Sequence, residues 1–151
     1  MKAADIMTRD VKTISIDATV EDAAIFLAEN HISGAPVINK NGELAGIITE
    51  HDFLLKEKIK RAAPRMSMFG LFVVSEENVR KAFDGYRKVP VSEIMTKKII
   101  SFGEDDKVSD IAVVMHKHNI NRVPILSEGK VAGIVSRADI VKAMAQGKEE
   151  F

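Results

Sequence analysis

The feature that most constrains the fold of this chain is an internal repeat. Ile6-Met7-Thr8 recurs 88 residues later as Ile94-Met95-Thr96, and the same offset holds through the first half of each copy. The offset falls to 87 between Gly46 and Gly133, because the second copy has one residue fewer in a loop. Loops tolerate such deletions between copies of one fold. The chain is therefore predicted to be two copies of one small unit.

Each copy has the pattern of a β-α-β-β-α unit. An extended stretch, at 11–16 and again at 99–102, precedes a helix whose apolar residues recur at i, i+3, i+4 and i+7 and so share one face. This stripe consists of Val20, Ala23, Ala24 and Leu27 in the first copy and Val108, Ile111, Ala112 and Met115 in the second. Two strands joined by a turn and a closing helix complete the unit. The predicted fold class is α/β, of the α+β type.

Short motifs predict where the elements begin and end. Thr19 with Asp22 is typical of an N-terminal capping box. Asn41-Gly42 predicts a hairpin turn between strands at 35–38 and 44–48, because both turn residues tolerate positive φ. The corresponding features of the second copy are strands at 123–126 and 130–135 around Glu128-Gly129, and the closing helices begin near Thr49 and Ser136.

The repeat also divides the chain into segments. The first copy spans 1–58, an unrepeated linker 59–89, the second copy 90–147 and a tail 148–151. Within the linker, Ser75 is predicted to cap a short helix over 76–84, which Gly85 stops. A unit of this size is only marginally stable alone, so the two copies are expected to share a core about a pseudo-twofold axis.

Composition excludes several classes of protein. The 151 residues include 22 Lys and Arg against 22 Asp and Glu, which argues against a nucleic-acid binder that depends on overall basicity. There is no Cys, so disulfides, Cys-ligated zinc, iron–sulfur clusters and thiol catalysis are excluded. Charges at Lys2, Asp5 and Arg9 interrupt any signal-peptide core, and the longest apolar stretch, 66–74, is shorter than a spanning helix. We expect a cytoplasmic protein that makes no membrane contact.

The residues that carry chemistry lie at the end of the last strand of each copy. The motif runs Gly46-Ile47-Ile48-Thr49-Glu50-His51-Asp52 in the first copy and Gly133-Ile134-Val135-Ser136-Arg137-Ala138-Asp139 in the second. A hydroxyl followed three residues later by Asp is also an ordinary helix cap, favoured by the helix dipole. Its occurrence at matching points of a repeat favours a nucleoside site. The Asp can accept from both ribose hydroxyls, the helix amides can meet a phosphate, and the Gly lets a flat base approach the backbone.

With these motifs the sequence resembles the CBS domain, named for cystathionine β-synthase, in its tandem form, the Bateman module. The resemblance covers nearly the whole chain. Besides the two Gly-to-Asp motifs it rests on Asp5-Ile6-Met7-Thr8 and Glu93-Ile94-Met95-Thr96 as opening motifs, and on Ala35-Pro36-Val37 and Val123-Pro124-Ile125 in the middle of each copy. Each motif alone is weak, but the ordered set, present twice, is specific.

The resemblance implies two CBS repeats that form a regulatory module and bind AMP, ADP, ATP or S-adenosylmethionine in clefts between them, with no catalytic cofactor and no metal. Asp52 and Asp139 would hold the ribose, and Thr49 and Ser136 would lie near the ribose or phosphate. Residues expected to flank the base are Thr13, Ile14, Ala35, Pro36 and Val37, and in the other copy Ser101, Phe102, Val123, Pro124 and Ile125. A homodimer is expected, with an effector protein reading the ligand-bound state.

The two copies differ at this predicted site. The second copy has Asn121-Arg122 and Arg137 where the first has Ser33-Gly34 and Glu50. In the family a basic residue at the Arg122 position often contacts phosphate. The repeat-two site is therefore predicted to prefer a phosphorylated nucleotide, and the repeat-one site to accept phosphate poorly unless Arg137 or another base reaches across the cleft. The alternative is that both arginines are solvated surface charges.

The remaining polar features support weaker hypotheses. His51 lies inside the motif and either meets a ligand, senses pH or lies at the surface. His116 and His118 point to different helix faces and so cannot jointly bind a metal. An apolar cluster at 66–73 is expected to pack against the second copy or a dimer partner.

Two alternative functions stay open beside the ligand-binding module, and neither is enzymatic. The sequence has no Cys nucleophile, no P-loop and no metal-ligand spacing, so no enzyme is predicted. One alternative is a structural or dimerisation module whose motif Asp residues are only helix caps. The other is a weak nucleic-acid binder that uses the basic run from Lys56 to Arg65.

Overall fold

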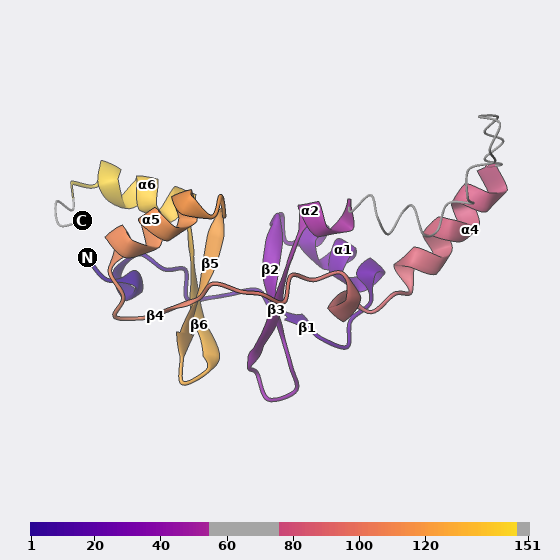
Figure 1. Ribbon diagram of the computed structural model, residues 1–151, viewed down its shortest axis with the longest axis horizontal. Coiled ribbons are helices and arrows are strands. Elements are labelled where there is room, and N and C mark those ends of the chain that lie inside the picture. The colour runs from indigo at the N-terminus through magenta and orange to yellow at the C-terminus, as the bar shows by residue number, and fades with distance from the viewer. Residues whose placement is uncertain (55–75, 148–151) are drawn as a thin grey trace.

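The computed structural model describes residues 1–54 and 76–147, which form two β-α-β-β-α units side by side (Figure 1). The first unit consists of β1 (Ile14–Ser15), α1 (Val20–Glu29), β2 (Gly34–Ile38), β3 (Leu44–Thr49) and α2 (Glu50–Phe53). The second consists of β4 (Phe102–Gly103), α5 (Val108–Lys117), β5 (Arg122–Ser127), β6 (Lys130–Ser136) and α6 (Arg137–Ala145). The predicted fold class is confirmed.

Each unit contains one three-stranded sheet with the same topology. The strand orders are β1-β2-β3 and β4-β5-β6, with the first pair parallel and the second antiparallel. Register shifts occur at Val37/Ile38 and at Ile125/Leu126, which are matching points of the repeat. The first strands, β1 and β4, are shorter than the extended stretches predicted at 11–16 and 99–102.

The predicted helix stripe covers the sheet as expected. Val20, Ala23 and Leu27 of α1 are buried, whereas Ala24 is exposed. The cap is confirmed, because the Thr19 amide donates to Asp22 Oδ2 (2.9 Å) and the Asp22 amide donates to Thr19 Oγ1 (3.2 Å). Hydrogen bonds from the Thr19 backbone and hydroxyl lower the pKa of Asp22.

The two hairpins differ from the turn prediction. Gly42 has φ +78°, but Asn41 is not at positive φ, because the side chain of Asn39 accepts from the Asn41 and Glu43 amides (2.9 and 3.0 Å) and widens the turn. The tight two-residue turn occurs in the second copy, where Glu128-Gly129 has φ values of +52° and +78°. The Asn-Gly prediction of positive φ at both residues is therefore wrong.

The two copies exchange their opening segments, which we define as residues 1–8 and 90–96. Thr96 exchanges two backbone hydrogen bonds with Ile47 of β3 (2.8 and 3.0 Å), and Thr8 does the same with Ile134 of β6 (2.9 and 3.0 Å). Each opening segment thus pairs with the edge of the other copy's sheet. The N-terminus accordingly lies beside the second unit in Figure 1.

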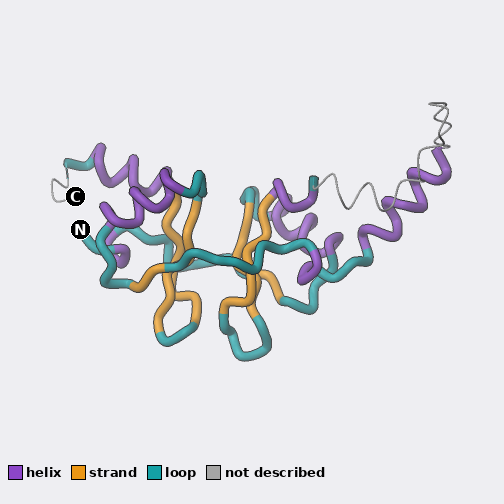
Figure 2. The backbone as a smooth tube through the Cα atoms, in the orientation of Figure 1, coloured by secondary structure: helices purple, strands orange, loops and turns teal. Residues whose placement is uncertain are grey.

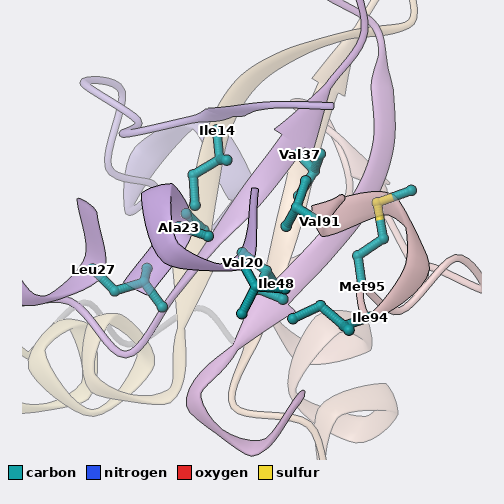
Figure 3. Packing of buried hydrophobic residues seen from close by; sticks show 10 residues of the cluster. Ile14, Val20, Ala23, Leu27, Val37, Ile48, Val91, Ile94 and Met95 are labelled. Carbon is teal, nitrogen blue, oxygen red and sulfur yellow. The ribbon is translucent and has the colours of Figure 1, made fainter. Parts of the chain in front are cut away.

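This exchange completes two separate cores. Val91, Ile94 and Met95 belong to the core of the first unit, where they pack around β2, β3 and α1 (Figure 3). Ala3 and Met7 occupy the same places in the core of the second unit. The prediction of one shared core is therefore wrong: the units are joined by exchanged segments, each of which contains a 3-10 turn, Ala3–Asp5 or Val91–Glu93.

The linker helix α4 spans Glu76–Arg87 and projects from the first unit (Figure 2). It passes through Gly85, so the predicted stop there is wrong: Gly85 is not at positive φ and simply continues the helix. The predicted cap at Ser75, the basic run and the apolar cluster at 66–73 lie outside the described residues. In the described part of the chain, no helix is long and apolar enough to cross a membrane.

Candidate functional site

The motif at each strand end forms a helix cap. Thr49 ends β3 and precedes α2, and Asp52 Oδ2 accepts hydrogen bonds from the Thr49 amide (2.7 Å) and hydroxyl (3.2 Å). In the second copy Asp139 Oδ2 accepts from the Ser136 amide (2.7 Å) and hydroxyl (2.6 Å). The ordinary capping role weighed for these residues is therefore present in both copies.

Capping leaves the second carboxylate oxygen of each Asp for other partners, since a carboxylate offers about four acceptor positions. Asp52 is 7% exposed, and its Oδ1 accepts from the hydroxyl of Thr96 (3.3 Å), which belongs to the opening segment of the second copy. Asp139 is half-buried, and its Oδ1 accepts no hydrogen bond from the described residues. Both carboxylates can therefore accept from a ligand while they remain caps.

A cavity of about 590 Å³ opens over Asp52; we name it the Asp52 cleft. Its wall brings together five of the predicted site residues: Thr49, His51, Asp52, Asn121 and Arg122. Asn121 and Arg122 come from the second copy, so the cleft is built from both.

The Asp52 cleft also contains residues that were not predicted as site residues, among them Thr96 and Lys98. Thr96 and Lys98 reach this cleft because the opening segment of the second copy lies along β3. The repeated Ile-Met-Thr motif was the signal for Thr96. Lys98 had none, because its counterpart in the first copy is Asp10.

A smaller cavity, of about 230 Å³, opens over Asp139; we name it the Asp139 cleft. It is lined by Ser136 and Asp139 of the second copy, by Pro36 of the first and by Lys12, which follows the first opening segment. The same structural positions therefore surround both motif carboxylates, as the repeat requires. Arg122 lines this cleft as well.

Arg122 crosses from one copy to the other. Its guanidinium donates from Nη1 to the Gly34 carbonyl (2.9 Å) and from Nη2 to the Ser33 hydroxyl. Burial lowers the pKa of Arg122, and the negative charge of Glu50 opposes that shift. A Cβ at Gly34 would lie 2.9 Å from Nη1, so the glycine of the first copy makes room for the arginine of the second.

Arg137 is held away from both clefts. Its Nε donates to the Ile120 carbonyl (3.1 Å) and its Nη2 to Asn119 Oδ1 (3.1 Å), which fixes the side chain against the loop before β5. The structure therefore does not assemble the predicted repeat-two group of Arg122 and Arg137 around Asp139. Instead Arg122 is the base that reaches across toward the first copy's motif.

Tyr86 supports the back of the Asp52 motif. Its hydroxyl, on α4, donates to the Phe53 carbonyl (3.2 Å) of α2. Burial, together with the negative charge of Asp52, raises the pKa of Tyr86. The linker helix is thereby joined to the helix that carries Asp52.

Comparison with known proteins fits this geometry. The family model described as CBS domain matches residues 3–59 and 91–146. The chain belongs to the CBS domain family. It is 31% identical to protein MJ1426 of Methanocaldococcus jannaschii over 93% of this chain and 89% of that protein.

Two solved CBS structures are similar throughout. The CBS domain of a CBS domain containing membrane protein from Sphaerobacter thermophilus is 33% identical, with a TM-score of 0.71 over 94% of this chain and 86% of that one. The CBS domain pair of protein MJ0100, in complex with 5′-methylthioadenosine and S-adenosyl-L-methionine, is 27% identical, with a TM-score of 0.69 over 99% and 98% of the chains. CBS domain pairs are generally regulatory rather than catalytic.

Most of the residues expected to flank a base are buried within the two CBS repeats. Five of them belong to the two hydrophobic cores: Ile14, Ala35, Val37, Val123 and Ile125. Pro124 is fully buried, Phe102 packs against the second core, Thr13 is half-buried, Ser101 is exposed, and Pro36 lines the Asp139 cleft. None of these residues lines the Asp52 cleft, and only Pro36 lines the Asp139 cleft, so their place beside a base stays a prediction.

The motif glycines accommodate methionines in this structure. A Cβ at Gly46 would lie 2.8 Å from Met95 Cγ, and a Cβ at Gly133 would lie 2.8 Å from Met7 Cγ. These glycines were expected to let a flat base approach the backbone, but methionine side chains occupy the space beside them. Each glycine of one CBS repeat instead receives the methionine of the other repeat's opening segment.

Proposed function

We propose that this CBS pair is a regulatory module that binds an adenosyl ligand in the Asp52 cleft and passes the bound state to a partner protein. The observation that carries the proposal is a buried motif carboxylate at a cavity of about 590 Å³ that both repeats line. That volume lies in the range of roughly 300–1,000 Å³ common for small-molecule sites. The Asp139 cleft, at about 230 Å³, is below that range and is proposed as the weaker site.

The roles of the side chains in the Asp52 cleft follow from their chemistry. Asp52 Oδ1 would accept from the ribose hydroxyls in place of Thr96, and Thr49 would lie beside the sugar. Arg122 and Lys98 line the same cavity and can donate to phosphate oxygens. His51 and Asn121 line it too and supply further polar contacts.

The ligand class is an adenosine with an anionic substituent. The complex of the MJ0100 pair with 5′-methylthioadenosine and S-adenosyl-L-methionine supports the adenosyl group. Arg122 and Lys98 in the Asp52 cleft would attract the phosphates of AMP, ADP or ATP and repel the sulfonium of S-adenosylmethionine. Glu50, in the same cleft, would attract the sulfonium, but it is opposed by these two cations. No catalytic cofactor is required.

We further propose a cytoplasmic homodimer that pairs through helices. Apolar side chains are exposed on α5 and α6, at Val113, Val141 and Met144, and on the first unit at Ile25 and Leu54. Large exposed apolar side chains that gather on packed helices are typical of interfaces. Light scattering on wild type and a Val141→Glu variant would test this: the variant should be monomeric.

The competing function is a structural module without ligand, because both motif carboxylates are bound to their own caps. Thermal-shift measurements with AMP, ADP, ATP and S-adenosylmethionine separate the two. A ligand at 100 times its Kd adds about 2.7 kcal/mol of stability. Asp52→Asn should reduce this shift to the smaller one that binding in the Asp139 cleft provides, whereas Asp22→Asn, which alters an equivalent cap outside the clefts, should leave it unchanged. No shift with any of the four compounds would favour the structural module.

A further inference from the structure

We propose that Arg122 is a single cation shared by the two clefts, so that phosphate-bearing ligands in the Asp52 and Asp139 clefts weaken each other's binding. This inference rests on the proposed function and adds its regulation. The structural basis is that the Arg122 side chain lines both cavities. Its guanidinium therefore lies in the wall between them, within reach of an anion on either side.

The charges around each cleft show why phosphate binding there depends on Arg122. The Asp52 cleft has Lys98 as its other strong cation, but Glu50 stands beside Asp52. A phosphate entering without Arg122 would therefore meet two carboxylates and one ammonium group.

The Asp139 cleft has the same balance. Its other cation, Lys12, is 4.0 Å from Asp10, and Asp10 and Asp139 both line the cavity. The formal charge of the lining residues is thus negative in each cleft when Arg122 is left out, and neutral when it is included. Each cleft needs the same guanidinium to receive a phosphate.

The repeat supplies no second arginine. The position that matches Arg122 in the first copy is Gly34, whose carbonyl and lack of a Cβ hold the guanidinium in place. Because Arg122 is half-buried, the protein around it screens charges less than water does. A second anion that approaches the same guanidinium would therefore be repelled by the first. Two phosphates would repel one another across one guanidinium. Such a coupling is reciprocal, so each ligand weakens the other by the same factor.

Calorimetric titrations with AMP and with adenosine test this inference. Adenosine has the same base and ribose but no phosphate. The Asp139→Asn variant reports the Asp52 cleft alone, and Asp52→Asn reports the Asp139 cleft alone. In the wild-type chain the second AMP binds the Asp139 cleft. We expect its Kd to be at least about tenfold higher than the Kd of AMP for the same cleft in Asp52→Asn, where the Asp52 cleft is empty. Adenosine should bind each cleft of the wild type as it binds the single-cleft variants.

Variants of the arginine identify the shared charge. Arg122→Gln should weaken AMP binding in each cleft about tenfold and abolish the difference between the first and second AMP. Arg122→Lys keeps the positive charge but lacks the paired donors of the guanidinium, and it should retain the coupling. This variant provides the test if Arg122→Gln does not fold. Arg87→Gln, the loss of an arginine on α4 that lines neither cleft, should change neither affinity nor coupling.

The outcomes separate this inference from the proposed function. Two AMP molecules that bind wild type with the single-cleft affinities would overturn the sharing of Arg122 while nucleotide binding stands. Coupling that survives in Arg122→Gln, or an Asp52→Asn variant that binds no AMP, would also overturn it. If neither AMP nor adenosine binds the wild-type chain, the proposed function itself fails.

Discussion

Asp52 combines a structural and a recognition role in one side chain. Its Oδ2 caps α2, while its Oδ1 accepts only the long hydrogen bond from Thr96 (3.3 Å) among the described residues. A ribose can therefore replace one weak partner without breaking the cap. The same argument applies to Asp139, but the cavity above it is smaller.

At this scale we predict an unequal response to loss of the two carboxylates. Asp52→Asn should raise the Kd of the first AMP at least about tenfold, because the amide presents one acceptor and one donor to the ribose. Asp139→Asn should leave that first Kd within about threefold. Calorimetry of both variants checks this, and equal losses would contradict the ranking of the clefts.

The identity of the site residues was partly accessible from sequence. Asp52 and Thr49 were predicted from the repeated strand-end motif, and Arg122 was predicted from the family resemblance. The partner of Arg122 was not predictable, because its contact with Gly34 depends on how the second copy is placed against the first. The same holds for Lys98, which reaches the Asp52 cleft through the exchanged segment alone.

Among the elements, the hairpins show how one side chain can alter a turn. Asn41-Gly42 has the sequence of a tight turn, yet Asn39 binds two amides and widens it. Glu128-Gly129 forms the tight turn with an unfavourable residue at φ +52°. Local sequence therefore predicted the presence of both hairpins but not their types.

We expect Glu128→Asn to stabilise the chain, because Asn tolerates positive φ better than Glu. The gain in the free energy of unfolding should be about 0.5–1 kcal/mol, measured by urea denaturation. Asn41→Glu is the matched control, since the Asn41 side chain makes no hydrogen bond with the described residues and its φ is not positive. The control should change stability by less than about 0.5 kcal/mol. A larger loss at Asn41 than gain at Glu128 would contradict this account.

The α1 cap gives a second prediction for an element. Thr19→Ala should lower the free energy of unfolding by about 1 kcal/mol, because Asp22 loses its hydroxyl partner. Accepting from Thr19 lowers the pKa of Asp22 below its ordinary 3.8, so this contribution is present above that pH and is lost as the pH falls through the lower folded-state pKa. Thermal denaturation of both proteins should therefore show the difference shrinking in acid. A difference that grows on acidification would contradict the cap.

At the scale of the whole molecule, the two repeats are joined by exchanged segments. Met95 fills the space beside Gly46, and Met7 the space beside Gly133. The repeat predicted two similar units, and the helix stripes predicted most of the buried helix residues, with Ala24 the exposed exception. The exchange itself was not predictable, since neither propensity nor periodicity specifies which copy an opening segment will contact.

The exchange predicts a coupled pair of substitutions. Gly46→Ala should destabilise the chain by about 1–3 kcal/mol, because the new methyl overlaps Met95. Met95→Ala should cost about 2–5 kcal/mol by leaving a cavity in the core of the first unit. In the Met95→Ala background, Gly46→Ala should cost almost nothing. Urea denaturation of the four proteins measures this cycle, and simple additivity would show that the two residues do not meet.

The most direct test of the central proposal is a crystal structure of the chain with AMP. The account predicts a ribose in the Asp52 cleft, with a sugar hydroxyl about 2.5–3.0 Å from Asp52 Oδ1 and phosphate oxygens near Arg122. A structure at saturating AMP in which Asp52 Oδ1 still accepts from Thr96, and the cleft holds only water, would contradict it.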